Sequence, residues 1–218
     1  MNVVRVKDIF VKELSVDFRM QYALASIFLF AATIVFVIYK SFNNINPREW
    51  VIMLWVIMLF AALNAIVKSF LQEKKETYLY YYTLFNPIDL LIAKLVYNFV
   101  FLVSLLTVII LIMTFFSGFP VKDLGLFTLG SLLGIAGISV VFTFVSIMSS
   151  SGGGHSTLMS ILALPLVLPI LLLLLKISTV SVRLIVDTSV GNDVMLLLGV
   201  DCILLGAVFM LFPMLWRS

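Results

Sequence analysis

Residues 59–98, LFAALNAIVKSFLQEKKETYLYYYTLFNPIDLLIAKLVYN, decide how this chain is organised. One apolar run ends in this stretch, a charged and tyrosine-rich segment follows, and a second apolar run begins. Three lysines and two glutamates lie between Lys68 and Glu76, and four tyrosines follow from Tyr78 to Tyr82. Charges beside an aromatic band are typical of a helix that leaves a bilayer through its interface. We therefore expect residues 68–86 to form a surface segment that joins two membrane helices.

The composition places the whole chain in the membrane class. Of its 218 residues 63% are apolar and the mean hydropathy is +1.22, whereas soluble domains hold roughly 45–50% apolar residues. Only 11% of residues are charged, so no sizeable soluble domain is expected, and the net charge of +3 requires no nucleic-acid partner. The single cysteine, Cys202, excludes an intrachain disulfide. The chain is predicted to be an all-α membrane protein with one domain over residues 1–218.

Six apolar runs have about the length that crosses a hydrocarbon core of about 30 Å at 1.5 Å per residue. The predicted spans are residues 22–39, 50–67, 90–116, 124–148, 156–175 and 194–216. Proline-containing turns are expected at Asn46-Pro47 and at Gly118-Phe119-Pro120. Pro87 and Asp89 give the third helix a start signal, and its first turn is expected to project beyond the bilayer.

Residues 1–21 are too highly charged for a secretory signal peptide. Val6, Phe10, Leu14 and Phe18 recur at every fourth position and form a narrow apolar stripe. This pattern predicts an elbow helix that lies in the membrane interface. The alternative is a solvated tail that orders only against a partner.

Basic residues predict the orientation in the membrane. With six crossings the two termini share a side with residues 68–86, and this side holds eight lysines and arginines against five on the other side. The eight are Arg5, Lys7, Lys12, Arg19, Lys68, Lys74, Lys75 and Arg217, and the five are Lys40, Arg48, Lys122, Lys176 and Arg183. The positive-inside rule therefore places both termini in the cytosol.

Asp201 is the one carboxylate predicted deep within a span. Such a group costs roughly 2.5–3.5 kcal/mol on insertion scales, so it should face protein or water. By depth, Asn64 and Asn98 are its nearest polar candidates. The functional interpretation is a substrate or conformational site; the alternatives are a structural hydrogen bond, or a sixth helix that starts later than residue 194.

Neither a metal centre nor a catalytic site is indicated by the remaining motifs. Residues 149–154, SSSGGG, lack the Lys-Ser/Thr ending of a phosphate-binding loop. His155 is the only histidine, and we interpret it as an ordinary loop residue. Gly130 and Gly134 form a GxxxG pair that allows close helix contact, within the chain or between subunits, with the former favoured.

Four segments carry a resemblance to a known family: 12–24, KELSVDFRMQYAL; 59–73, LFAALNAIVKSFLQE; 78–98, YLYYYTLFNPIDLLIAKLVYN; and 164–174, LPLVLPILLLL. Together they resemble haem exporter protein B, the CcmB family. The resemblance implies a six-helix permease of the ABC-2 exporter type in the bacterial inner membrane. It implies a non-catalytic subunit that works with the ATPase CcmA, the membrane proteins CcmC and CcmD, and the haem chaperone CcmE. ATP would be bound by the partner ATPase and haem handled by the complex, with no cofactor bound directly by this chain.

The segment around residue 74 is the predicted docking site for the ATPase. Phe70, Leu71 and Leu79 are expected to act as apolar anchors. The expected polar rim consists of Gln72, Glu73, Lys74, Lys75 and Glu76. The alternative is an interfacial segment held by its tyrosines alone. Two other function classes stay open: an ABC-2 permease that exports another amphiphile such as a lipid or drug, and a stand-alone secondary transporter or intramembrane enzyme.

Overall fold

The computed structural model describes residues 7, 9–12, 15, 21–42, 45–72, 87–151, 156–183 and 190–215. Within these residues the chain is helical and contains no strand, which confirms the all-α prediction. The long helices are α2 (Gln21–Ser41), α3 (Pro47–Gln72), α5 (Pro87–Ser117), α6 (Leu124–Ser151), α7 (Ser156–Arg183) and α8 (Val190–Leu215).

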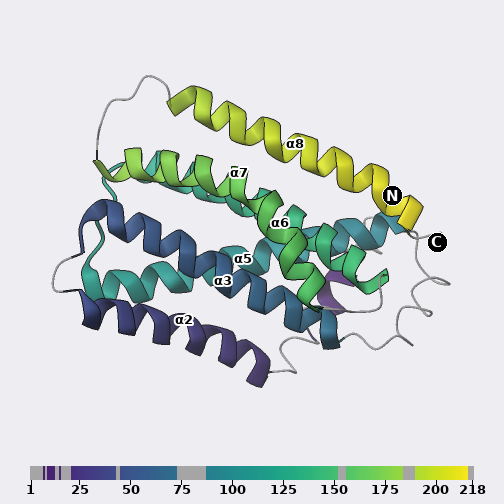
Figure 1. The fold of residues 1–218 in the computed structure, drawn as a ribbon, viewed down its shortest axis with the longest axis horizontal. Helices are drawn as coiled ribbons and strands as arrows, with labels where there is room; N and C mark the ends of the chain where they lie inside the picture. Colours follow the sequence, from purple (N-terminus) through teal and green to yellow (C-terminus); the bar gives the residue numbers. More distant parts are fainter. Residues whose placement is uncertain are drawn as a thin grey trace.

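The long helices lie side by side in a bundle (Figure 1). Helix α2 forms one edge and contacts α3 and α5, while α8 forms the opposite edge and contacts α6, α7 and α5. The most extensive contact joins α6 to α7. The centre of the bundle is therefore built by α3, α5, α6 and α7.

Five of these helices are long and apolar enough to cross a membrane: Pro47–Ala65, Ile88–Ser117, Leu124–Val145, Ala163–Val182 and Val190–Phe212. Helix α2 contains the shorter apolar stretch Ala25–Ser41. Its 21 residues would extend about 31 Å at the rise of an α-helix. A sixth crossing by α2 therefore remains a prediction.

Small residues let α6 and α7 approach closely. A Cβ atom at Gly130 would lie 2.7 Å from Cγ2 of Ile177, and one at Gly134 would overlap the side chain of Leu174. Helices in a bilayer associate through such close packing, because lipid tails are as apolar as the side chains that they replace. The GxxxG pair of α6 thus faces α7 within the chain, as favoured from the sequence.

A buried hydrogen bond joins α3 and α7 near one end of the bundle. The indole Nε1 of Trp55 donates to Oγ of Ser178 over 3.0 Å, and both side chains are fully buried. Burial of the indole without an acceptor would leave an unsatisfied donor at a cost of about 1–3 kcal/mol. The pair therefore specifies which faces of α3 and α7 meet.

The two turns predicted from proline are present. Asn46 precedes α3, whose first residue is Pro47, and Glu49 accepts hydrogen bonds from the backbone N–H and the side-chain amide of Asn46 at 3.0 and 3.2 Å. Asn46 is the N-cap residue and Glu49 the third residue of the helix, so the backbone hydrogen bond is one of the two bonds of a capping box. At the end of α5, Gly118 has φ +78°, the left-handed conformation that ends many helices.

Helix α7 carries two prolines, Pro165 and Pro169, and is bent along its length in Figure 1. Each proline removes one backbone donor and crowds the preceding turn, which bends a helix. Both prolines lie on the exposed side of α7, whereas Val167 and Ile170 are buried. The bend therefore leaves the packed face of α7 intact.

Part of the predicted elbow helix lies within the described residues. Residues 9–12 are helical, and Ile9 is only 2% exposed. The ring of Phe10 lies edge-on to that of Tyr97 in α5, with the ring centroids 6.2 Å apart. Of the apolar stripe, Val6, Leu14 and Phe18 fall outside the described residues, so the interfacial helix stays a prediction.

Candidate functional site

The predicted docking segment starts inside α3. This helix continues to Gln72, five residues beyond the predicted end of the second span, so Phe70, Leu71 and Gln72 belong to its last turn. The other predicted docking residues, Glu73, Lys74, Lys75, Glu76 and Leu79, lie outside the described residues. The prediction that these residues form one docking surface therefore remains open.

Asn98 forms the buried polar contact between α5 and α6. Its Nδ2 donates to Oγ1 of Thr143 over 2.7 Å, and this hydroxyl donates in turn to the carbonyl oxygen of Ser139 over 2.6 Å. Asn98 is 7% exposed and Thr143 is fully buried. A buried polar side chain needs such a partner in a bilayer, and each hydrogen bond of this kind contributes roughly 0.6 kcal/mol, up to about 1.7. Asn98 therefore has a packing role between two helices.

Asp201 lies near the middle of α8 and is 5% exposed. Neither of its carboxylate oxygens has a hydrogen-bond partner within the described residues. The carboxylate lies against Gly137 of α6, where an added Cβ would overlap Oδ1 of Asp201 and would come within 2.9 Å of Cδ1 of Ile170 in α7. A buried polar group left unpaired in this way is costly. Asp201 and Gly137 are therefore the clearest candidate site in the part of the chain that the structure describes.

Neither of the polar neighbours predicted for Asp201 is hydrogen-bonded to it. Asn64 is exposed on α3, and Asn98 is hydrogen-bonded to α6. Depth alone suggested both residues; α8 packs on α6, α7 and α5, so α3 with Asn64 is not among its main neighbours. The alternative of a late helix start is wrong, because α8 begins at Val190 and places Asp201 three turns inside.

Two charged side chains near the start of α5 are buried, which was not predicted. Asp89 is 2% exposed and Lys94 is 7% exposed, and Leu90 and Leu91 are equally enclosed. The expected projection of this turn beyond the bilayer stays a prediction, and the turn itself packs against the rest of the bundle. The physical reason is a second core cluster in which Leu91 and Leu95 pack against Val140 of α6 and against α8.

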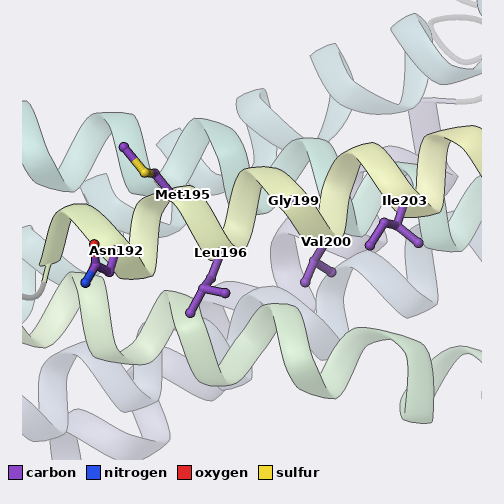
Figure 2. Close-up of a pocket in the computed structure, with 6 residues that line it drawn as sticks. All are labelled: Asn192, Met195, Leu196, Gly199, Val200 and Ile203. Carbon is purple, nitrogen blue, oxygen red and sulfur yellow. The ribbon is translucent and has the colours of Figure 1, made fainter.

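Helix α8 also carries an exposed groove of about 490 Å³. It is lined by Asn192, Met195, Leu196, Gly199, Val200 and Ile203. Figure 2 shows Leu196, Val200 and Ile203 pointing to one side of the helix and Met195 to the other. The wall is apolar except at Asn192, so the groove suits a lipid chain or another helix rather than a charged ligand.

Candidate metal ligands do not cluster in the described residues, where no group of three or more histidine, cysteine, aspartate or glutamate side chains could hold an ion. His155 falls outside these residues. Cys202 is a free thiol on the exposed side of α8.

The comparison with protein families decides what kind of membrane protein this is. The family model described as CcmB protein matches residues 4–213, almost the whole chain. The chain belongs to the CcmB family. No curated protein and no solved structure matches it. The resemblance found in the sequence is thus confirmed.

Membership in the CcmB family makes the chain a membrane permease component of the haem-export ABC system. As a permease subunit it is a non-catalytic, multi-pass membrane protein. The polar residues of the bundle are accordingly interpreted in terms of packing and movement of helices rather than bond-making chemistry.

The orphan carboxylate of Asp201 gives a prediction. Asp201→Asn removes the ionisable group and keeps its size, so we expect normal amounts of the protein and largely preserved cytochrome c assembly. Haem staining of c-type cytochromes, together with an immunoblot of the subunit, measures both quantities. Full abundance with complete loss of cytochrome c assembly would instead make the carboxylate itself functional.

Proposed function

We propose that this CcmB chain is the subunit that converts ATP hydrolysis by the separate ATPase CcmA into helix movement during haem delivery. The movement would release the haem-loaded chaperone CcmE from a complex that also contains CcmC and CcmD. The observation that carries the proposal is the family match over residues 4–213. The sequence contains no phosphate-binding motif, which is consistent with a partner that binds ATP.

A mechanical role fits the chemistry of the described residues better than a haem conduit does. Haem iron is held by axial ligands such as histidine, cysteine or methionine. In the described part of the bundle, the largest buried side chains are apolar packing residues such as Trp50, Trp55 and Phe142. We therefore favour a role in which the helices move against each other over a role as a haem conduit.

The proposed path of force starts at the end of α3. Phe70 and Leu71 lie in its last turn, and residues 73–86 connect α3 to α5. A partner that displaces this end would move α3, and the Trp55–Ser178 hydrogen bond would pass the displacement to α7. Residues 68–86 and both termini would face the cytosol of a bacterium, with the chain in its inner membrane and α2 as a sixth span.

The topology is tested by single cysteines in a Cys202→Ala background. Cysteines at Lys74 and at either terminus are expected to react with an impermeant reagent only in inverted vesicles, and a cysteine at Lys122 only in intact spheroplasts, because basic residues stay on the cytosolic side. The yield of labelled protein under each condition is the readout. Labelling of Lys74 and Lys122 from the same side would refute the six-span arrangement.

The function is tested by deleting the gene in a host that makes c-type cytochromes and depends on this system. We expect holo-cytochrome c to disappear and haem-loaded CcmE to persist, with recovery when the gene is returned. Haem staining of membrane and periplasmic fractions measures both species. Unchanged cytochrome c in the deletion strain, together with altered lipid or drug export, would favour an ABC-2 permease for another amphiphile.

A further inference from the structure

A second cavity, of about 430 Å³, lies where three segments of the chain meet. Asn46 and the first turn of α3, with Pro47, Arg48 and Glu49, form one side of the cavity. The α5–α6 connection contributes Lys122, and the end of α7 contributes Val182. The lining thus combines the apolar Pro47 and Val182 with two cationic side chains, one carboxylate and one amide.

Hydrogen bonds hold the pocket in shape. The backbone N–H groups of Lys122 and Asp123 both donate to the carbonyl oxygen of Ser181, at 3.2 and 3.0 Å. The hydroxyl of Ser181 donates to the carbonyl oxygen of Ser178. The side-chain hydroxyl of Ser178 in turn accepts the hydrogen bond from the indole of Trp55. The loop that carries Lys122 is therefore tied to the end of α7, and α7 is tied to α3.

The pocket has unused capacity to bind an anion. Among the described residues, neither the Arg48 guanidinium nor the Lys122 ammonium has a hydrogen bond or an ion pair. The one carboxylate in the lining, Glu49, accepts two hydrogen bonds from Asn46, and the two cations exceed its negative charge by one. The first turn of a helix leaves backbone N–H groups without an acceptor inside the helix. In α3 these include the N–H groups of Arg48 and Glu49, which have no hydrogen-bond acceptor among the described residues.

The depth of the pocket identifies the source of the anion. Pro47 is the first residue of the span Pro47–Ala65, and Val182 is the last residue of the span Ala163–Val182. A pocket bounded by the ends of two spans lies at the edge of the hydrocarbon core, in the layer of lipid headgroups. The phosphate of a phospholipid is the anion that is concentrated in this layer.

We propose that this pocket binds the headgroup phosphate of an anionic phospholipid. Arg48, Lys122 and the first-turn N–H groups of α3 hold the phosphate, and Pro47 and Val182 contact the lipid beside it. The bound lipid joins the ends of α3 and α7 to the α5–α6 connection. The site is separate from the proposed coupling to an ATPase, since it depends only on residues at this end of the bundle.

The test is native mass spectrometry of the purified full chain in detergent, titrated with phosphatidylglycerol, phosphatidylcholine or inorganic phosphate. Each of Arg48→Gln and Lys122→Gln is expected to weaken the tightest phosphatidylglycerol adduct about fivefold, and both together roughly 25-fold, from the attraction of one cation near an anionic headgroup. The matched control is Lys40→Gln, which removes an exposed cation in the last turn of α2, outside the pocket. The double variant Arg48→Lys with Lys122→Arg keeps both charges and is expected to retain binding.

Three results would overturn the proposal. One is unchanged phosphatidylglycerol affinity in the double glutamine variant. Another is an equal loss in Lys40→Gln, which would show attraction to net charge alone. The third is full competition by millimolar inorganic phosphate, with phosphatidylglycerol bound no better than phosphatidylcholine, which would make the pocket a free-phosphate site. Circular dichroism and gel filtration of each variant confirm that the helices and the monodisperse state are retained.

Discussion

Replacing Phe70 and Leu71 together by serine is expected to abolish recovery of the ATPase subunit with the purified chain and to leave membrane insertion intact. Both residues lie in the last turn of α3, beyond its span Pro47–Ala65. Apolar anchors at the centre of an interface carry most of its binding free energy, and the loss of one such anchor costs about 2 kcal/mol or more. Loss of two anchors corresponds to a fall in affinity of roughly a thousandfold. Co-purification in mild detergent, measured by quantitative immunoblot, gives the result.

The matched control removes two exposed apolar residues at the opposite end of the bundle. Phe42 and Leu124 are 46% and 57% exposed, and Phe42→Ser with Leu124→Ser should leave ATPase recovery unchanged. A second variant adds charge reversal at Glu73 and Lys74 to the serine pair. Normal yield of the ATPase with all four residues changed would place the docking site elsewhere on the chain.

Gly137→Ala is expected to destabilise the bundle, and Asp201→Ala is expected to reverse much of the loss. The added methyl group would overlap Oδ1 of Asp201 and would press on Ile170. Overpacking of this kind costs about 1–3 kcal/mol. Removal of the carboxylate frees the space over Gly137 and removes an unpaired buried polar group, so the double variant should be more stable than Gly137→Ala alone. Thermal unfolding in detergent and the amount of subunit in membranes measure the effect.

Gly199→Ala provides the control for the glycine substitution. Nothing lies within 4 Å of a Cβ at this position on the exposed side of α8, so its stability should be unchanged or slightly higher. A double variant no more stable than Gly137→Ala would show that the strain comes from Ile170 or the backbone. That result would contradict the expectation that the contact between Asp201 and Gly137 limits how closely α8 packs against α6.

Helix ends were predictable from sequence because their signals are local. Asn46, Pro47 and Glu49 act within one turn of each other, and the turn at Gly118 needs only the left-handed conformation of one residue. The apolar runs likewise predicted the helices, since a bilayer requires every backbone group to be paired within its own segment. The extension of α3 to Gln72 was missed because Lys68 and Ser69 interrupt the apolar run that predicted the span.

The identity of neighbouring helices was not predictable, because it depends on tertiary packing. Asn64 and Asp201 share a similar predicted depth, yet they lie on helices from different parts of the bundle. Burial of Asp89 and Lys94 follows from a cluster that α5 forms with α6 and α8. The contact of Gly137 with Asp201 had no sequence signal of its own.

The most direct test of the proposed coupling is the amount of ATPase and of haem-loaded chaperone bound to the tagged chain after purification in mild detergent. The wild-type chain is expected to carry the ATPase in a fixed ratio, and haem-loaded chaperone is expected to accumulate on it when an ATPase variant that binds but does not hydrolyse ATP is supplied. Recovery of the chain without any ATPase, with the chaperone released at the normal rate under both conditions, would contradict the proposed role.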